Sequence, residues 1–342
     1  MIKTLIAVIV LVFVVGDATA RSFTDGAGRK VELPDKITRV LAAGPPASVA
    51  VYALAPDKLV GWVNEFPTAA RPFVAKPHID LPVHGRLTGR GNTANMEIVL
   101  KLKPDIIVDF GSVDATYASL ADKVQEQTGI PYVLIDGAFA RSAQSLRDLG
   151  DAIDASQRAF ALSAYAESTL NEVRAIVGGT PADKRPRVYY GRGPNGLETG
   201  LGGSINLQVL EAVGAINVAA VAGKGGLTNV SMEQILAWSP DIVIAQDGNF
   251  LARAAGDPLW QGLRAVRERR IYRAPEMPWG WFDSPPGINR LIGVRWLTAA
   301  LYPGLGVSDL REETREFYKL FYHVEITDAQ LDDLLKDATA AK

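Results

Sequence analysis

The sequence predicts an α/β protein in which two doubly wound lobes are joined by a long rigid helix. Apolar runs typical of buried parallel strands alternate with helical patterns both early and late in the chain. Between these regions, residues 142–177 keep a helical apolar pattern that contains no proline. A segment of the early region also reappears in the late region, which indicates two lobes of similar fold.

The first lobe is expected over residues 21–141. Its strands are predicted where short apolar runs end in turn-forming residues, and its helices where apolar residues recur at helical spacing. Gly44-Pro45-Pro46 closes the first buried run, and Pro104-Asp105 separates a helix from the strand that follows it. These patterns place strands at 39–43, 59–63, 106–109 and 132–135, and helices at 48–54, 96–102 and 117–128.

The long helix is expected over residues 142–177. An apolar stripe runs along it, and the Gly-Gly-Thr-Pro sequence at 178–181 ends it. Two ordinary helices that meet near Gly150 are the alternative interpretation. The second lobe is expected over residues 186–342 and begins with a strand at 187–190.

The repeated segment is the strongest indication of two lobes. Residues 95–108 and 231–244 each begin with a small polar residue and Met-Glu, continue as an apolar helix, and pass through Pro-Asp into an apolar strand. The fixed spacing of Met-Glu to Pro-Asp argues against a chance recurrence of short helix–strand units. We therefore expect two lobes of similar fold that face each other.

Residues 1–20 have the pattern of a cleavable signal peptide. An apolar run over 5–15 is followed by the small residues Ala18 and Ala20, so cleavage is expected before Arg21. The run is short for a membrane span, but an uncleaved anchor is the alternative. No cysteine follows the run, which argues against a lipid anchor of the bacterial lipoprotein type. We therefore expect export to the periplasm.

Composition limits the partners and the chemistry. The chain has 342 residues and a formal net charge of −2, whereas a nucleic-acid-binding protein usually carries a basic excess. It has no cysteine, which excludes disulfides, thiolate metal sites and a cysteine nucleophile. His78, His84 and His323 are its only histidines, too few for a typical bare Zn²⁺ or Mn²⁺ site. The sequence therefore predicts no nucleic-acid partner, no resident metal and no cofactor.

Together these features resemble the periplasmic substrate-binding proteins with a helical linker that serve iron–siderophore, haem and cobalamin ABC importers. The resemblance covers essentially the whole chain after residue 20. It rests on the paired Met-Glu to Pro-Asp units, the segment between the lobes, and Trp279–Tyr302 followed by Phe317-Tyr318. It implies a monomer, not an enzyme, that captures a small ligand between its lobes and delivers it to an ABC permease in the inner membrane.

In that family, one glutamate on the outer face of each lobe docks onto arginines of the permease. The resemblance assigns this role to Glu97 and Glu233. Two carboxylates on a two-lobed protein can meet two basic clusters on a symmetric permease. The alternative is that each is a solvated charge at a helix start, where the helix dipole favours it.

Loops expected to face the cleft carry arginine, tyrosine and tryptophan. The glycine-rich segment 85–91 brings two guanidiniums near backbone N–H groups, which suits an anionic group. Segments 189–193 and 279–283 each combine aromatic and charged residues, and aromatic walls with a few arginines suit a bulky metal chelate. The candidate ligand-binding residues are Arg86, Arg90, Ser112, Tyr117, Tyr190, Arg192, Trp279, Trp281 and Asp283.

An iron–siderophore-like chelate is therefore the expected ligand, and a small oxyanion such as molybdate or tungstate is the alternative. An oxyanion would use Arg90 and backbone amides and would need little aromatic surface. A periplasmic hydrolase is a further alternative, because Asp109, Asp136 and Asp247 end apolar strands, where α/β enzymes place catalytic groups. No nucleophile elbow, nucleotide fingerprint or histidine-rich motif accompanies them.

Overall fold

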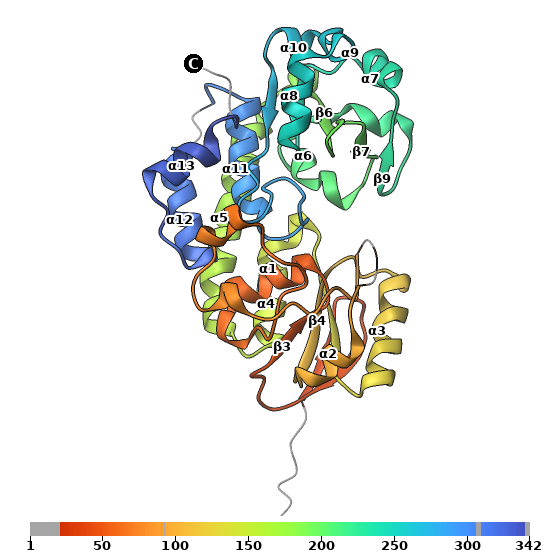
Figure 1. Ribbon diagram of the computed structural model, residues 1–342, viewed down its shortest axis with the longest axis vertical. Coiled ribbons are helices and arrows are strands. Elements are labelled where there is room, and N and C mark those ends of the chain that lie inside the picture. Colours follow the sequence, from red (N-terminus) through yellow and green to blue (C-terminus); the bar gives the residue numbers. More distant parts are fainter. Residues whose placement is uncertain (1–20, 90, 92, 306–308, 339–342) are drawn as a thin grey trace, which may run out of the picture.

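The computed structural model describes residues 21–89, 91, 93–305 and 309–338 as an α/β molecule of two lobes (Figure 1), which confirms the predicted fold class. The predicted signal peptide, residues 1–20, lies outside the described residues. Each lobe is built around a small parallel sheet. No helix in the described part of the chain is long and apolar enough to span a bilayer.

The first lobe consists of a hairpin, a parallel sheet and covering helices: β1 (Arg21–Thr24), β2 (Lys30–Leu33), β3 (Val40–Ala42), α1 (Pro45–Leu54), α2 (Met96–Lys101), β4 (Ile106–Gly111), α3 (Ala115–Thr128) and β5 (Tyr132–Asp136). The sheet order is β3-β4-β5. The central strand β4 is buried from Ile106 to Phe110, which explains its apolar sequence. Asp109 is the one charged residue of this buried stretch. The run predicted as a strand at 59–63 makes only isolated bridges, at Leu59 and Trp62.

The second lobe repeats this plan: β6 (Arg187–Gly191), β7 (Glu198–Gly200), α6 (Gln208–Ala212), β8 (Ile216–Asn217), β9 (Leu227–Asn229), α7 (Met232–Trp238), β10 (Ile242–Ala245), α8 (Gly248–Gly256), α9 (Pro258–Gln261), α10 (Arg264–Arg267) and β11 (Ile271–Arg273). Its parallel sheet has the order β11-β10-β6-β8, and β7 pairs with β9 in an antiparallel ribbon. Tyr189 and Tyr190 of β6 pack into different hydrophobic clusters, because successive strand residues point to opposite faces of the sheet.

The sequence repeat corresponds to one structural unit that occurs in both lobes. Asp105 and Asp241 donate their backbone N–H to the carbonyls of Arg39 and Arg187, at 2.8 Å in each lobe. Their carboxylates accept the N–H of the same arginines, at 2.9 and 3.2 Å. The arginine side chains donate to carbonyls at the C-terminal ends of α2 and α7. The Pro-Asp pair therefore fastens each helix–strand unit to the start of a neighbouring strand.

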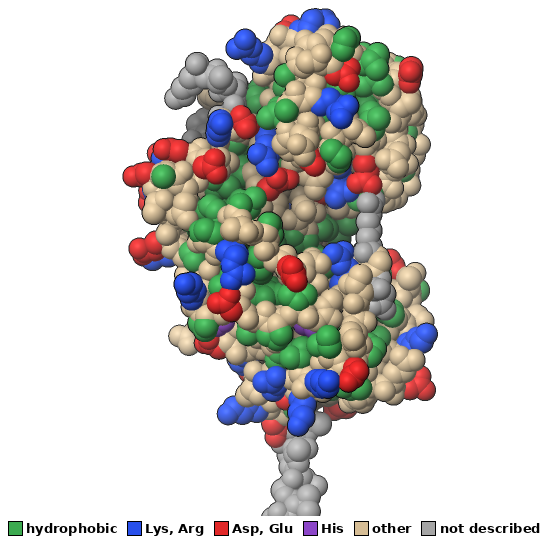
Figure 2. Space-filling view, viewed as in Figure 1, with side chains coloured by type: hydrophobic (Ala, Val, Ile, Leu, Met, Phe, Trp, Pro, Cys, Tyr) green, Lys and Arg blue, Asp and Glu red, His purple; other side chains and the backbone are tan. Residues whose placement is uncertain are grey.

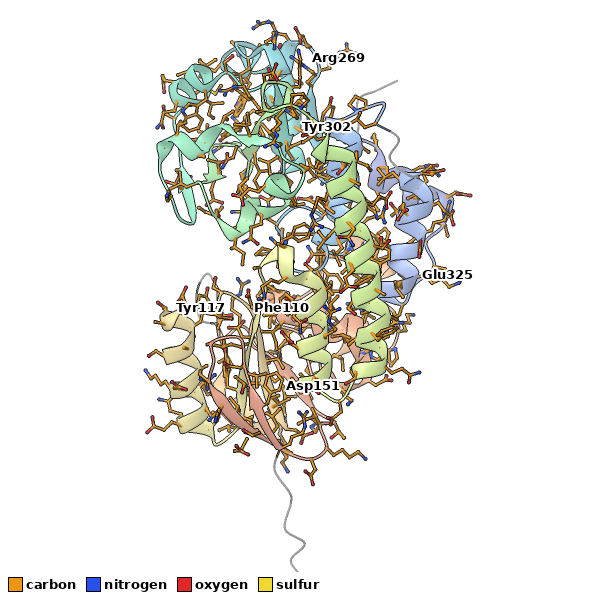
Figure 3. The ribbon with its side chains drawn as sticks, turned by 180° about the vertical axis from the view of Figure 1, so that it is seen from behind. Phe110, Tyr117, Asp151, Arg269, Tyr302 and Glu325 are labelled. Atoms are coloured by element: carbon orange, nitrogen blue, oxygen red, sulfur yellow. The ribbon has the colours of Figure 1, made fainter. Side chains whose placement is uncertain are left out.

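Residues 142–177 form two helices, α4 (Ser142–Ala152) and α5 (Ser156–Gly178). The prediction of one continuous helix was therefore wrong, and the alternative of two helices is confirmed, with the break just after Gly150. Asp154, with a φ of 54°, turns the chain between them. The helices lie so close that a Cβ on Gly150 would be 2.2 Å from the Cβ of Ala159. The long helix beside both lobes is α5 (Figure 3).

The C-terminal helices are not confined to the second lobe, to which we assigned residues 186–342. The helix α11 (Arg290–Leu301) packs along α5, where Arg295 donates to Glu172 at 2.7 Å. The helix α12 (Leu310–Tyr322), followed by α13 (Asp328–Leu335), lies against the first lobe: the Tyr52 hydroxyl of α1 donates to the Tyr322 carbonyl at 2.6 Å. The chain therefore returns to the first lobe after completing the second.

Candidate ligand-binding site

A cavity of about 880 Å³ lies between the lobes. The space-filling view shows the surface hollowed at this position (Figure 2). Its walls come from the start of α1, the loops at 62–67 and 86–89, the end of β4, the loop after β6 and residues 276–286 of the segment 274–289. The loops that follow β4 and β6 lie at the carboxyl ends of these strands, and this is where open α/β sheets place ligand sites.

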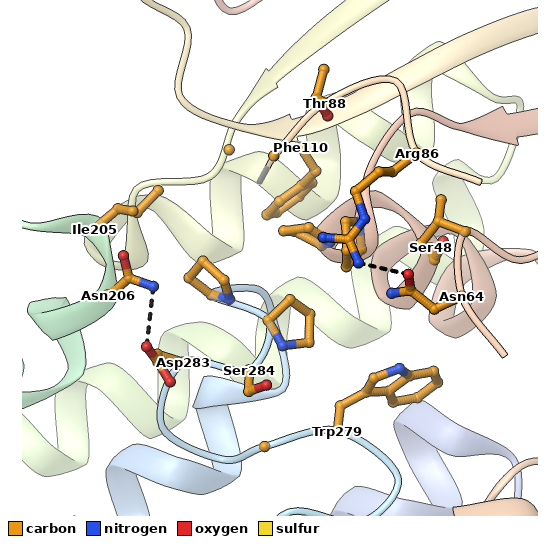
Figure 4. Close-up of a pocket in the computed structure, with 18 of the residues that line it drawn as sticks. Ser48, Asn64, Arg86, Thr88, Phe110, Ile205, Asn206, Trp279, Asp283 and Ser284 are labelled. Carbon is orange, nitrogen blue, oxygen red and sulfur yellow. Dashed lines mark hydrogen bonds between the residues drawn. The ribbon is translucent and has the colours of Figure 1, made fainter. Parts of the chain in front are cut away.

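Arg86 is the charged residue that the glycine-rich loop brings to the first-lobe wall. Its guanidinium donates to Asn64 Oδ1 at 2.7 Å (Figure 4). Gly85 makes the loop possible, because its φ is 81° and a Cβ there would lie 2.4 Å from the Thr93 carbonyl oxygen. Arg90, the second arginine predicted for this loop, lies outside the described residues.

Asp109 places a buried carboxylate in the same wall. The residue is 4% exposed, and its oxygens accept hydrogen bonds from the Thr88 hydroxyl at 3.2 Å, the Phe110 N–H at 2.9 Å and the Tyr132 hydroxyl at 3.3 Å. Burial raises the pKa of Asp109 to about 6, although these hydrogen bonds favour the ionised form and oppose the shift. The group can therefore gain or lose a proton close to neutral pH.

Arg192 of the second lobe reaches the cavity within a network of carboxylates. Its Nε forms an ion pair with Asp283 Oδ2 at 2.8 Å, and its Nη1 pairs with Glu198. Asp283 is 2% exposed and also accepts hydrogen bonds from the Tyr190 hydroxyl and, at 3.1 Å, from Asn206 Nδ2 (Figure 4). Burial raises the pKa of Asp283, and the neighbouring Arg192 opposes that shift.

Trp62, Phe66 and Trp279 form an aromatic wall of the cavity. The ring centroid of Trp279 lies 6.0 Å from that of Trp62 and 5.8 Å from that of Phe66. Tyr52 and Tyr322 support Trp279 from behind, with centroids at 5.7 and 4.9 Å. These contacts hold Trp279, which follows the second lobe in sequence, against rings of the first lobe. Such a wall can cover a flat apolar surface of a ligand.

Two proline pairs also line the cavity, Pro45-Pro46 at the start of α1 and Pro285-Pro286 in the segment 274–289. The two segments approach closely, since a Cβ on Gly287 would lie 3.5 Å from Pro46. Proline has no N–H, so the first turn of α1 offers fewer of the donors with which helix starts commonly bind anions.

Arg290 joins the two lobes beside the cavity. Its buried guanidinium donates to the carbonyls of Gly137 in the first lobe at 3.1 Å, Ile205 in the second at 2.7 Å and Gly287 at 3.1 Å. It also lies over the Phe139 ring, 5.0 Å from the centroid. Burial lowers the pKa of Arg290 to about 9, so the side chain remains a cation at neutral pH.

The structure brings six of the candidate residues to the cavity: Arg86, Ser112, Tyr117, Arg192, Trp279 and Asp283. Tyr190 and Trp281 do not line it, which corrects our expectation, because both side chains are fully buried. The Tyr190 ring stacks on Phe282 with centroids 3.9 Å apart, and Trp281 Nε1 donates to the Tyr318 hydroxyl at 3.4 Å. Both therefore support the residues of the cavity from inside the core.

Sequence reasoning missed further cavity residues: Trp62, Asn64, Glu65, Phe66, Asn206 and Glu276. Trp62 lies within the run predicted as a strand at 59–63, and Asn64, Glu65 and Phe66 follow directly on it. The loop after a predicted strand could have identified these three residues. Asn206 and Glu276 carried no comparable signal. Asp109 was noted as a strand-end carboxylate but not as a residue of the binding site.

Glu97 and Glu233 lie away from the cavity, in the first turns of α2 and α7 on different lobes (Figure 1). The Glu97 side chain is 76% exposed and pairs with Lys101 at 3.0 Å, and Glu233 is exposed as well. Leu100 and Leu236, one helical turn further on, are 50% and 36% exposed. The two helices therefore present the same pair of side-chain types to solvent.

None of the three histidines lines the cavity. His78 lies 3.5 Å from Asp57, His84 is buried, and His323 Nε2 lies 3.1 Å from the Tyr52 carbonyl. Within the ranges that the structure describes, no cluster of three or more histidine, aspartate and glutamate side chains is arranged to hold a metal ion.

Two parallel-sheet lobes, a helix beside both and a cavity between them are the architecture of a two-lobed binding protein. The chain belongs to the periplasmic binding protein family, whose model matches residues 71–278. It is 26% identical over 332 residues to the molybdate-binding protein MolA of Haemophilus influenzae, a match that covers 88% of this chain and 91% of MolA.

Solved structures of binding proteins have the same fold as this chain. An ABC transporter solute binding protein from Sulfurospirillum deleyianum superposes with a TM-score of 0.82 at 28% identity, covering 92% of this chain and 99% of that chain. The vitamin B12 binding protein BtuF of Vibrio cholerae shares the fold, with a TM-score of 0.59 at 20% identity over 75% of this chain and 94% of its own. The class predicted from the sequence, a binding protein of ABC transporters, is confirmed.

Proposed function

We propose that the protein, after export and removal of residues 1–20, acts as a monomer that binds a metal chelate between its lobes and delivers it to an ABC permease. The size of the cavity carries the proposal. A volume of about 880 Å³ falls in the range of about 300–1,000 Å³ that encloses drug-sized molecules. The aromatic wall supplies the flat apolar surface that the organic part of a chelate would cover.

A small oxyanion is the second candidate, favoured by the molybdate-binding relative and by Arg86 on its glycine-rich loop. The described walls support it less well. The helix start that faces the cavity begins with Pro45 and Pro46, which have no N–H to donate. Arg192 is already paired with two carboxylates, and a tetrahedral ion could not contact the whole aromatic wall.

Tryptophan fluorescence offers a direct test, because Trp62 and Trp279 line the cavity. We expect saturable quenching by a ferric trihydroxamate or a ferric tris-catecholate, and weaker binding of molybdate. Trp279→Ala should lower affinity for the chelate about tenfold to a hundredfold, through lost aromatic burial. Trp238→Ala, which removes a half-buried indole that does not line the cavity, is the matched control and should leave affinity unchanged. Tight molybdate binding that survives Trp279→Ala, without any chelate binding, would overturn the proposal in favour of the oxyanion.

We further propose that Glu97 and Glu233 bind basic clusters on the permease, with Leu100 and Leu236 adding an apolar contact beside each carboxylate. The support is the family resemblance together with the equivalent exposure of these residues on the two lobes.

The docking test is the double variant Glu97→Arg with Glu233→Arg. Uptake by whole cells should be lost while ligand affinity is unchanged, because neither residue lines the cavity. Glu126→Arg with Glu316→Arg, two exposed helical glutamates elsewhere, makes the same charge change and should retain uptake. Weakened ligand binding in the first double variant would contradict the docking assignment.

A further inference from the structure

The charged residues that the structure describes in the cavity wall are mostly acidic. The described lining residues that carry charge are Arg86, Arg192, Glu65, Asp109, Glu276 and Asp283. Two guanidiniums thus face four carboxylates. A site built for a multiply charged anion would show the opposite balance, because carboxylates repel an anion that lies among them.

The second-lobe arginine does not supply surplus positive charge. Arg192 contacts both Asp283 and Glu198, so two carboxylates surround one guanidinium. Glu276 is matched by Arg273 at 2.7 Å. Arg290 adds a cation behind the wall, but its donors are directed to three carbonyl oxygens rather than to the cavity. The second-lobe side of the cavity is therefore acidic or neutral.

Among the residues that the structure describes, the first-lobe side adds the carboxylates of Glu65 and Asp109 beside the guanidinium of Arg86. Glu65 is exposed in the loop that also carries Phe66 of the aromatic wall. Asp109 is held by the hydroxyls of Thr88 and Tyr132 and by a backbone N–H, all neutral donors. An arriving cation would therefore meet the exposed carboxylate of Glu65 on this wall, with the buried Asp109 behind it.

The aromatic wall favours the same sign of charge. The faces of indole and phenyl rings are electron-rich and attract a cation within about 6 Å of the ring centroid. Trp62, Phe66 and Trp279 line the cavity together, and Glu65 directly precedes Phe66. The proline pair at the start of α1 removes donors that would have favoured an anion.

Resting on the chelate binding proposed above, we infer that the cavity selects a chelate without net negative charge and turns the cationic side of that chelate toward Glu65 and the aromatic wall. The ligand class is then a neutral or cationic complex, such as a ferric trihydroxamate that bears a free ammonium group. Polyanionic tris-catecholate complexes and bare oxyanions are disfavoured.

A series of complexes with one iron core and different charge tests this inference. The ferric complex of desferrioxamine B carries a pendant ammonium, its N-acetyl derivative is neutral, and its N-succinyl derivative is an anion. We expect affinity, measured by fluorescence quenching at low salt, to fall about threefold or more with each step toward negative charge. High salt should compress the differences. Equal affinities, or tightest binding of the succinyl or tris-catecholate complex, would overturn the charge selection and leave chelate binding intact.

A variant of Glu65 tests whether this residue produces the charge selection. Glu65 is exposed, so Glu65→Gln should fold normally and should reduce the preference for the ammonium-bearing complex over its acetyl derivative about threefold. Glu126→Gln, on the exposed face of α3, is the matched control and should retain the preference. An unchanged preference in Glu65→Gln would contradict the inference. Binding of molybdate with no binding of any chelate would instead overturn the proposed function itself.

Discussion

Asp109 and Asp283 are two buried carboxylates of one cavity, and each accepts a hydrogen bond from a buried tyrosine, Tyr132 or Tyr190. They differ in one partner, because Asp283 has the Arg192 guanidinium and Asp109 has only neutral donors. Burial raises the pKa of both groups, and a cation opposes the shift only at Asp283. Hydrogen bonds alone can therefore hold a buried carboxylate, but they leave it close to protonation at neutral pH.

Removing the charge of the paired carboxylate should have the largest effect. Asp283→Asn is expected to lower the free energy of unfolding by about 2–4 kcal/mol, because Arg192 loses a buried partner. Urea denaturation at neutral pH measures the change. Glu325→Gln, which breaks the exposed pair with Lys319 at 3.0 Å, is the control and should cost less than about 0.5 kcal/mol. Equal losses of unfolding free energy in the two variants would show that the ion pair of Asp283 with Arg192 does not stabilise the fold.

Asp109, which has no ion-pair partner among its hydrogen-bond donors, should show the opposite effect: removing its charge should stabilise the protein, by an amount that depends on pH. The folded-state pKa of Asp109, about 6, lies above the unfolded value of about 3.9, so the folded protein holds this proton more firmly. The stability that this tighter proton binding contributes is fully present below about pH 4 and is lost as pH rises through about 6. The free energy of unfolding of Asp109→Asn should therefore rise relative to that of the wild type as pH increases, by about 1–3 kcal/mol from about pH 4 to pH 7. Urea titrations across this range measure it, and a difference independent of pH would contradict the assignment.

The two tyrosine hydroxyls give the smallest expected effects. Tyr132→Phe and Tyr190→Phe should each cost about 1 kcal/mol of unfolding free energy, for one lost hydrogen bond. Tyr132→Phe should also raise the pKa of Asp109 further, because the lost donor favours the carboxylate. Urea denaturation and carboxyl NMR titration measure these changes. Tyr322→Phe is the control: its hydroxyl has no hydrogen-bond partner among the described residues, so it should be neutral. An unmoved pKa of Asp109 would mean that Tyr132 does not hold its carboxylate.

The fold was predictable where local pattern and burial agree. The strands β4 and β10 are apolar because both faces are covered, and the Pro-Asp pairs recur because they make the same hydrogen bonds in each lobe. For the linker, the sequence left the choice open between one continuous helix and two helices that meet near Gly150, and the structure has two. Gly150 and Ala159 matter through the close approach of α4 and α5, a tertiary contact that helical periodicity does not encode.

The site was predictable only in part, because its residues meet over long sequence separations. Arg192 and Trp279 were found from loop composition, and both line the cavity. Trp281 differs from Trp279 by two positions but lies inside the core, a choice made by packing against Tyr318. The partnership of Trp62 with Trp279 joins distant parts of the chain, and no local pattern predicts it.

Arg290 has a mechanical consequence. One side chain is attached to the first lobe at Gly137, to the second at Ile205 and to the intervening segment at Gly287. Separating the lobes would break a hydrogen bond of this buried cation to Gly137, to Ile205 or to both. We therefore expect any relative motion of the lobes to be smallest beside Arg290 and largest at the mouth of the cavity.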